Sequence, residues 1–190
     1  MLNETLSFLK TSLNNYLRMR GAAHDPQEDQ VVFLSGQSAD TISLKSGAVS
    51  LLLVRLEQEK VLRAPDLYQR IMPDGSVQKS APEIRLELYV LIVANYPQYE
   101  DALKNLSAII RYFQEHRLVT HETAPDLSDD IQQLVIELMS LSFAEQNEVW
   151  GSLRLPYHPS VLYKVKMVVY QSDTLDAAPA VAERVMGVQG

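Results

Sequence analysis

The strongest pattern of apolar and polar positions lies in the stretch from Glu83 to Arg117. In its first part, Ile84–Val90, apolar residues alternate with charged residues or tyrosine, which is the period of a strand with one solvated face. From Tyr89 to Ala94 every residue is apolar or aromatic. Because a strand that is apolar on both sides is usually covered on both sides, this pattern predicts a central strand.

A helix is expected directly after this strand. Pro97 fits its first turn, where the missing N–H costs little, and Glu100 and Asp101 would lie near the positive end of the helix dipole. A stripe of apolar residues at spacings of three and four follows, formed by Leu103, Leu106, Ile110 and Phe113. We expect the helix to fold back on the strand and the rest of the chain to pack around this pair.

The first twenty residues predict an amphipathic helix that ends near Gly21. Its apolar face is a stripe of leucines, namely Leu2, Leu6, Leu9, Leu13 and Leu17. The favoured interpretation is that this stripe packs on the domain's own sheet. The alternative is that it contacts a neighbouring subunit.

Two further strands are expected before the central one. Val31–Leu34 has the pattern of a short strand and Gly47–Lys60 that of a long one, while the polar segment 35–46 shows only weak strand character at Thr41–Leu44. We expect the long strand to pair antiparallel with Glu83–Asn95. Their connection, residues 62–82, contains the tight-turn signal Pro-Asp-Gly and forms an extended loop or the tip of a ribbon; loops of this length tend to be functional or mobile.

After the central helix the pattern predicts a short strand at Leu118–Glu122 and a longer one at Ile131–Ser142. Ser142 is expected to cap a short helix, with Glu145 at the capping-box position and Gly151 as its end. Val149 and Trp150 would face inward on this helix, with Trp150 as its anchor in the core. Alternating residues then predict a last strand at Ser160–Tyr170.

The predicted fold class is therefore α+β. A mixed or antiparallel β-sheet is flanked by the N-terminal helix, the long central helix and the short helix. We expect this domain to span residues 1–170. Residues 171–190 are small and loosely patterned, and we expect a C-terminal tail that serves as an interaction arm, in which 181–185 could form one turn of helix.

The composition of the chain argues against several classes of protein. With 190 residues and 46% hydrophobic residues, the chain can form one domain with a sizeable core. It has no run of about 18 apolar residues and no signal-peptide pattern, so we expect neither membrane insertion nor secretion by a leader. It has no cysteine, which excludes disulfides and thiolate metal sites and fits a reducing compartment. A net charge of −7 argues against non-specific nucleic-acid binding.

The sequence indicates no catalytic, cofactor-binding or metal-binding residues. Its four histidines lie in loops or at the ends of elements and lack the spacing of metal ligands: His24, His116, His121 and His158. Glycine-rich phosphate loops and the nucleophile elbow are also missing. Three carboxylates, Glu137, Glu145 and Glu148, could pair as acid and base, but a solvated face is the simpler interpretation. The scattered tyrosines fit a core edge or an interface.

Three segments together resemble a known family. They are Tyr89–Arg117 (YVLIVANYPQYEDALKNLSAIIRYFQEHR), Ile131–Gly151 with a match that continues to Leu153, and Leu155–Tyr170 (LPYHPSVLYKVKMVVY). Their order resembles the N-terminal, Pvc-type domain of the cap or tail tube terminator proteins of extracellular contractile injection systems of the antifeeding-prophage type. The N-terminal leucine helix also fits.

This resemblance implies a fold related to phage tail terminators and a structural role without catalysis or cofactors. It implies a homo-hexameric ring that ends the inner tube and connects to the last sheath ring, so that the partners are the tube and sheath proteins of one particle. The subunit would be cytoplasmic during assembly and then part of a phage tail-like particle, which can be released extracellularly.

A ring subunit needs different contact patches toward the two neighbours. We expect the 62–82 connection, the 35–46 segment and the 171–190 tail to supply them. Two other hypotheses stay open at this point. One is a small non-catalytic adaptor domain, monomeric or dimeric, from another assembly, and the other is an enzyme whose site the sequence does not reveal.

Overall fold

The computed structural model describes residues 1–20, 28–34, 42–59, 69–71, 77–79 and 84–169 of the chain. Two compact units are distinguished. The first comprises residues 1–60 and 83–170, and the second comprises 61–82 and 171–190. The expected tail and most of the 62–82 connection lie outside the described residues, as does His24.

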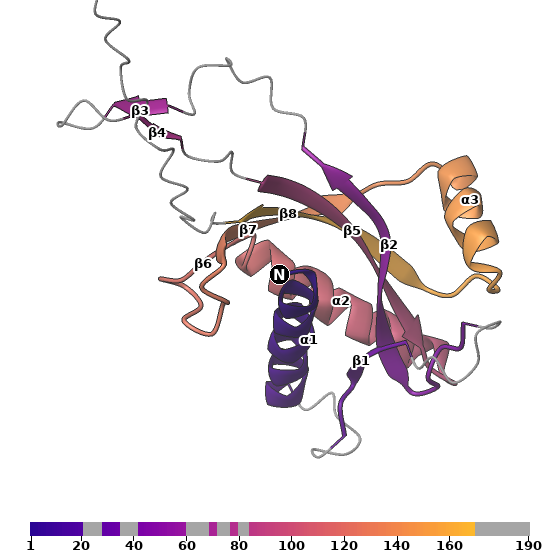
Figure 1. Ribbon diagram of the computed structural model, residues 1–190. Coiled ribbons are helices and arrows are strands. Elements are labelled where there is room, and N and C mark those ends of the chain that lie inside the picture. Colours follow the sequence, from indigo (N-terminus) through magenta and orange to yellow (C-terminus); the bar gives the residue numbers. More distant parts are fainter. Residues whose placement is uncertain (21–27, 35–41, 60–68, 72–76, 80–83, 170–190) are drawn as a thin grey trace, which may run out of the picture. The chain divides into compact units, whose positions relative to one another are not determined.

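The first unit contains a six-stranded sheet with the strand order β1-β2-β5-β8-β7-β6 (Figure 1). The strands are β1 (Val31–Phe33), β2 (Ala48–Gln58), β5 (Ile84–Asn95), β6 (Leu118–Thr120), β7 (Ile131–Met139) and β8 (Ser160–Val169). β1 runs parallel to β2, and all other neighbours pair antiparallel. A mixed or an antiparallel sheet was expected from the sequence, and the sheet is mixed; the antiparallel pairing of β2 with β5 was also expected.

The predicted central strand is confirmed, since β5 lies between β2 and β8. The alternation of apolar and charged residues at the start of β5 separates two faces of the strand, as predicted. Leu88, Val90 and Ile92 are buried on one face, whereas Arg85 and Glu87 stand on the other.

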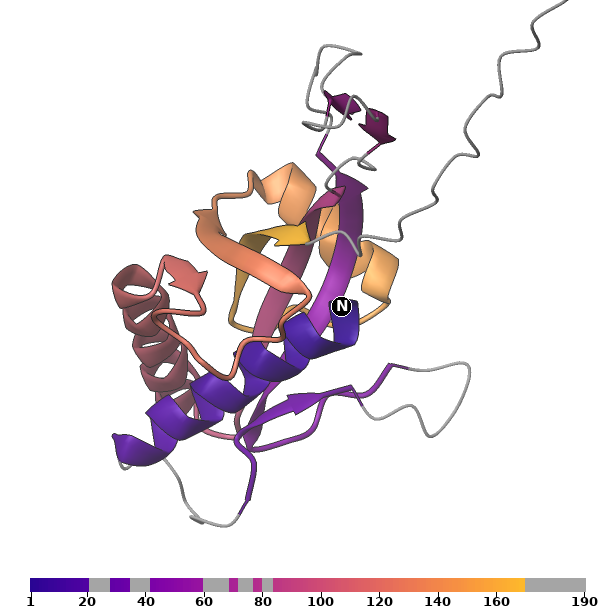
Figure 2. The ribbon, with the colours of Figure 1, turned by 60° about the vertical axis from the view of Figure 1, so that its left-hand side comes forward.

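Two helices, α1 (Leu2–Met19) and α2 (Tyr99–Glu115), cover one face of the sheet, called here the α1–α2 face (Figure 2). Leu9, Leu13 and Leu17 of α1 are fully buried in one cluster with residues of β2, β5, β7 and β8. The favoured interpretation of the leucine stripe is therefore confirmed: it packs on the domain's own sheet.

The predicted inner face of α2 is partly wrong. Leu106 and Phe113 are buried as expected, but Leu103 is exposed and Ile110 is only partly buried. The inward positions are filled instead by Ala102, Asn105 and Ile109. The helix also begins after Gln98, so that Pro97 precedes its N-cap rather than standing in its first turn. A small and a polar residue on the inner face concealed its true direction.

The third helix among the described residues, α3 (Phe143–Leu153), lies on the opposite face, called here the α3 face (Figure 1). Trp150 is its single buried residue and joins a cluster with residues of β2, β5 and β8. The predicted capping box is confirmed, because the Ser142 hydroxyl accepts from the Glu145 N–H at 3.3 Å and the Glu145 carboxylate accepts from the Ser142 N–H at 2.8 Å. Gly151 does not end the helix, which runs on to a left-handed Arg154.

Two smaller expectations also have an outcome. The weak strand expected at Thr41–Leu44 is absent among its described residues 42–44, where Leu44 packs beside the Trp150 cluster and its carbonyl accepts from the Asn95 amide at 3.1 Å. In the second unit, β3 (Gln69–Ile71) pairs antiparallel with β4 (Val77–Lys79), as expected for a ribbon tip.

A buried amide fixes the edge strand β1 to α1. The Asn14 side chain donates to the Val31 carbonyl at 2.9 Å and accepts from the Val31 N–H at 2.9 Å. On its other side β1 pairs with β2, where Val49 donates to the Gln30 carbonyl at 2.7 Å. Asn14 therefore occupies the place of a further strand and satisfies backbone groups that would otherwise be buried without partners.

Candidate functional site

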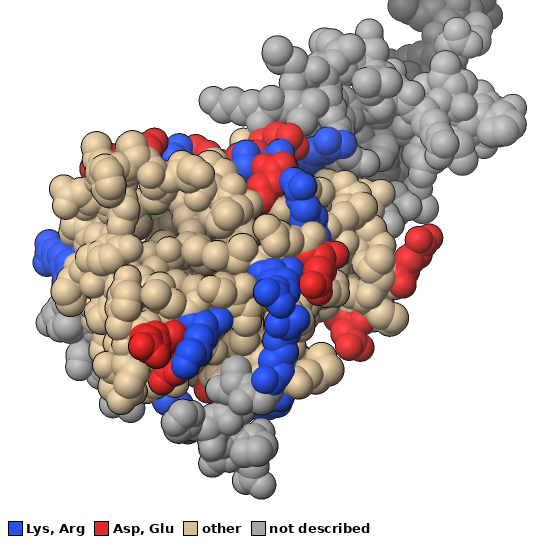
Figure 3. All heavy atoms as spheres, turned by 180° about the vertical axis from the view of Figure 1, so that it is seen from behind, with Lys and Arg blue, Asp and Glu red and all other residues tan. Residues whose placement is uncertain are grey.

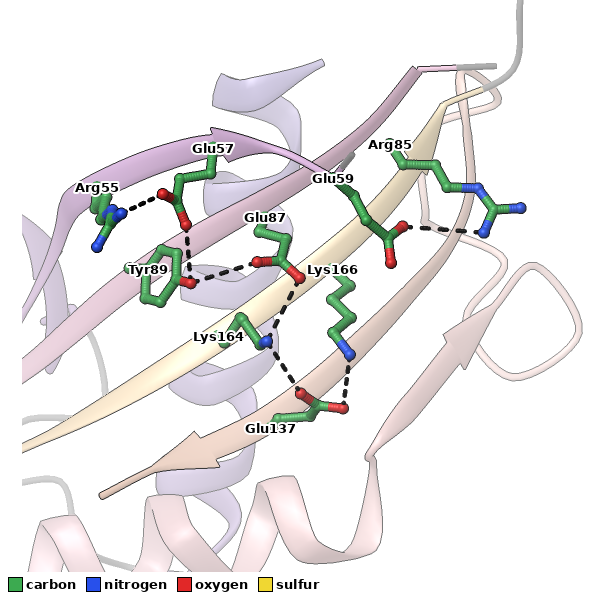
Figure 4. A network of polar contacts seen from close by, with 9 residues as sticks. All are labelled: Arg55, Glu57, Glu59, Arg85, Glu87, Tyr89, Glu137, Lys164 and Lys166. Carbon is green, nitrogen blue, oxygen red and sulfur yellow. Dashed lines mark hydrogen bonds and ion pairs between the residues drawn. The ribbon is translucent and has the colours of Figure 1, made fainter. Parts of the chain in front are cut away.

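A network of ion pairs and hydrogen bonds lies on the α3 face of the sheet, where Tyr89 packs against the cluster around Trp150 (Figure 4). Strand register produces two neighbouring rows of side chains across four strands. One row holds Arg55, Tyr89, Lys164 and Glu137, and the next holds Glu57, Glu87, Lys166 and Val135. The term charged rows refers to these eight positions.

Ion pairs connect the charged rows across the strands. Lys164 lies 3.4 Å from Glu87 and 3.7 Å from Glu137, and Lys166 lies 3.1 Å from Glu137. The hydrogen bond from Lys166 lowers the pKa of Glu137. Each lysine faces a carboxylate on a neighbouring strand, so the contacts hold β5, β8 and β7 in register.

Tyr89 relieves an unfavourable pair within the charged rows. Glu57 and Glu87 stand directly opposite each other on β2 and β5, where like charges repel. The Tyr89 hydroxyl lies 3.1 Å from Glu57 and 3.3 Å from Glu87, and Arg55 pairs with Glu57 and stands over the tyrosine ring at 5.4 Å. Burial raises the pKa of Tyr89, and its hydrogen bond to Glu57 raises that pKa further.

This geometry suits a structural role better than acid–base chemistry. A general base needs a pKa near the working pH, whereas the pKa of Glu137 is shifted downward. Glu145 is likewise engaged, because its hydrogen bond from the Ser142 backbone lowers its pKa. Of the carboxylates considered from the sequence, these two therefore bind neighbouring groups and stand on different elements, β7 and α3.

The described histidines each lie against a local group. His116 stacks on Tyr112 with ring centroids 4.3 Å apart, and the ring of His121 lies 3.3 Å from the Ser128 carbonyl. The ring centroids of His158 and Trp150 lie 6.1 Å apart. Within the described ranges, no group of three or more His, Cys, Asp or Glu residues is placed to hold a metal ion.

Two large side chains at the two ends of α3 are exposed. Phe143 at the start of the helix is 92% exposed, and Tyr157 is 60% exposed. The Tyr157 ring packs against Trp150, with the ring centroids 5.5 Å apart. Seen from behind, Lys and Arg stand beside Asp and Glu, with uncharged surface around them (Figure 3). Apolar side chains that are exposed singly are common on protein surfaces, so these two do not by themselves define a contact surface.

The sequence did not predict that the residues of the charged rows lie next to one another. The alternation in β5 and β8 identified their solvated faces, but the pairing of four strands decides which charges become neighbours. Trp150 was correctly expected as an anchor, whereas the exposure of Phe143 could not be read from a helix with so few apolar residues. Of the segments expected to make contacts, the described parts are 42–46, β3 and β4.

The described residues contain no helix that is both long and apolar enough to pass through a membrane.

Comparison with known proteins identified a family that matches most of this chain. Residues 4–183 match the model of the family described as the Pvc16 N-terminal domain. The search of curated proteins found no match.

Two solved structures share the fold. The first is described as the sheath/tube terminator of PVC, an extracellular contractile injection system, in the extended state; its TM-score is 0.53 at 17% identity, with 96% of this chain and 63% of that chain covered. The second is described as the tube terminating cap of the anti-feeding prophage, with a TM-score of 0.51 at 17% identity and coverage of 94% and 61%. The chain thus spans less than two thirds of the length of either.

Proposed function

The chain belongs to the Pvc16 N-terminal domain family, and we propose on that basis that it is a structural subunit of the cap that ends the inner tube of a contractile injection system. The observation that carries this proposal is the family match, which spans residues 4–183 and so nearly the whole chain.

The two solved structures support the proposal through their fold. Both are described as terminators of a tube, and both align over almost all of this chain. The remaining parts of those two chains lie outside the aligned region, so the proposed role is that of the shared domain.

The surface of the sheet also supports a role in assembly. At one edge, β1 pairs with only the first part of β2, and exposed Leu53 and Leu56 follow on β2. At the other edge, β6 pairs with only the middle of β7, and Leu118 and Leu138 are exposed. Exposed apolar side chains at two opposite edges suit a subunit that has a neighbour on each side.

The finer arrangement follows from the resemblance. We propose a ring of six copies that stops tube growth and connects to the terminal sheath ring. The subunit would join the particle in the cytoplasm and leave with it if the particle is released. We also propose that residues 171–190 act as an interaction arm of domain 1–170; the family match extends into the first part of this segment.

The test is the production of particles without this chain. A tube that lacks its terminator should continue to grow or lose its end, so we expect tubes of broader length distribution, or unstable particles, in electron micrographs. Particles of normal length, number and stability would overturn the proposal.

Two complementing chains make this test specific. The wild-type chain should restore the normal length. Ile92→Asp, which places a carboxylate at a fully buried position of the central strand, should not restore it, because the domain cannot fold around an unpaired charge. The matched exposed variant Asn147→Asp on α3 should restore it as the wild type does.

A further inference from the structure

A shallow hollow of about 350 Å³ lies between the C-terminal end of α1 and the outer side of α2. It is lined by Arg20, Leu103, Lys104, Ser107, Ala108 and Arg111. These six residues are called the basic hollow. The hollow lies apart from the charged rows, which stand on the α3 face, whereas α1 and α2 cover the other face.

The charge of the basic hollow opposes that of the whole chain. Three of its residues are cations, although the net charge of the chain is −7. Lys104 pairs with Asp101 at 3.3 Å. Arg20 stands over the Tyr16 ring at 4.8 Å, and neither Arg20 nor Arg111 forms an ion pair with a described residue. Within the described part of the chain no carboxylate pairs with these two guanidinium groups, so they can pair with an acidic group of another chain.

The basic hollow also contains an apolar residue, Leu103, which the sequence had placed on the inner face of α2. Leu103 is instead 43% exposed, because Ala102 and Ile109 occupy the inner face of the helix. The Ser107 hydroxyl is engaged, since it donates to the Leu103 carbonyl at 2.7 Å. An exposed leucine among cations suits a protein segment that carries carboxylates rather than a small anion alone.

The loop between β6 and β7, residues 121–130, has the complementary character. It carries four exposed carboxylates, Glu122, Asp126, Asp129 and Asp130. It is also well ordered. Leu127 is buried, and backbone bonds such as Ala124 N–H to the Thr120 carbonyl at 2.8 Å fix its turns. An ordered loop loses little conformational entropy on binding.

The loop and the basic hollow stand at opposite ends of α1. The Ser128 hydroxyl donates to Glu4 in the first turn at 3.0 Å, whereas Arg20 follows the last turn. At a rise of 1.5 Å per residue, these two ends are about 24 Å apart. One copy therefore cannot fill its own hollow with this end of its own loop, but two copies placed head to tail can join them.

We propose that the 121–130 loop of one copy docks into the basic hollow of the next copy. This inference rests on the proposed ring and names the contact that closes it. Two chains of charge −7 repel at long range, so their association needs a local match of opposite charges, which this pairing supplies. Because the pairs lie at a surface, added salt weakens the contact.

The test uses the absence of cysteine from the chain. A full-length chain with Ser107→Cys in the basic hollow and Asp129→Cys in the loop is produced with the rest of its particle and treated with a bifunctional thiol cross-linker. We expect a ladder of covalent multimers, because each copy links to the next. The matched control replaces Ser107→Cys by Ser152→Cys, another exposed helical serine whose hydroxyl donates to a backbone carbonyl, at 2.7 Å, and should give no ladder.

Charge reversal then tests the chemistry. In the cross-linking chain, Lys104→Glu with Arg111→Glu should abolish the ladder, as should Asp126→Lys with Asp130→Lys. All four changes together should restore it. A ladder that persists through either reversal, or that the combined reversal fails to restore, would overturn the proposed contact.

The two proposals fail in different ways. If the cross-linking chain is found at tube ends but gives no ladder, the contact is wrong and the cap stands. If it gives a ladder but never occurs at a tube end, the contact is right and the proposed function is wrong. If it does neither, both are overturned.

Discussion

Replacing Asn14 by alanine tests the account of the fold at one side chain. Its amide is buried, with 3% of the residue exposed, and makes two hydrogen bonds to the Val31 backbone, each of 2.9 Å. The variant leaves a buried N–H and a buried C=O without partners. Each such group costs about 1–3 kcal/mol, and alanine returns roughly 0.5 kcal/mol through its helix propensity. We therefore expect a net loss of about 2–5 kcal/mol.

The assay is equilibrium unfolding in urea, with the free energy extrapolated to water. A loss of this size would be a large part of the roughly 5–15 kcal/mol that holds an ordinary domain together. The neighbouring Asn15 provides a matched control, because it lies on the same helix but is exposed. Asn15→Ala makes the same change in helix propensity and should leave the stability unchanged or slightly increased.

A second variant separates the two hydrogen bonds. Asn14→Asp keeps an acceptor for the Val31 N–H but turns an oxygen toward the Val31 carbonyl, so it should be no more stable than Asn14→Ala. The reasoning would be refuted if Asn14→Ala and Asn15→Ala unfolded with free energies within about 1 kcal/mol of each other. A lower slope against urea in Asn14→Ala alone would indicate that β1 has detached in the native state.

Two further predictions concern α2 and the charged rows. Leu106→Ala, at a buried position, should lower the unfolding free energy by about 2–4 kcal/mol, whereas Leu103→Ala should lower it by less than about 1 kcal/mol; equal losses in urea unfolding would contradict the assigned face of the helix. Lys166 lowers the pKa of Glu137, so their pair stabilises the fold above the usual carboxyl pKa and is lost as the pH falls through the lowered value. Because both side chains are about one-third exposed, Glu137→Gln should cost at most about 1 kcal/mol near pH 7 and progressively less as the pH falls below the usual carboxyl pKa, and a cost independent of pH would refute this.

Periodicity predicted the long strands of the sheet, because parts of them alternate between apolar and polar residues. In β5 and β8 the alternation separates a buried face from a charged one, and a slip of either strand by one residue would move Leu88 outward or Lys164 inward. The capping box at Ser142 was equally clear, because capping is a local interaction between residues close in sequence.

Periodicity failed where a tertiary contact decides the outcome. On α2, two apolar stripes share Leu106 and Phe113, and only packing against the sheet selects the one that includes Asn105. The role of Asn14 could not be predicted, because its partner lies on β1 and an asparagine in a helix gives no sign of it. The basic hollow likewise arises where α1 and α2 meet, and no single segment contains it.

The proposed contact between copies does not use the segments that the sequence predicted as interfaces. The 171–190 tail and most of the 62–82 connection lie outside the described residues, and the contact proposed here uses the 121–130 loop and the outer side of α2. Sequence patterns favoured long polar stretches as interfaces. A short, ordered loop with four carboxylates was overlooked because acidic residues are common in a chain of this charge.

The most direct test of the proposed role is a cryo-electron microscopy reconstruction of the tube end in particles that contain this chain. The account predicts that the last ring of the tube is made of copies of this domain, with the six-stranded sheet recognisable and the 121–130 loop of each copy beside Arg20 and Arg111 of the next. A tube end built of other proteins, with this chain elsewhere or absent, would contradict it.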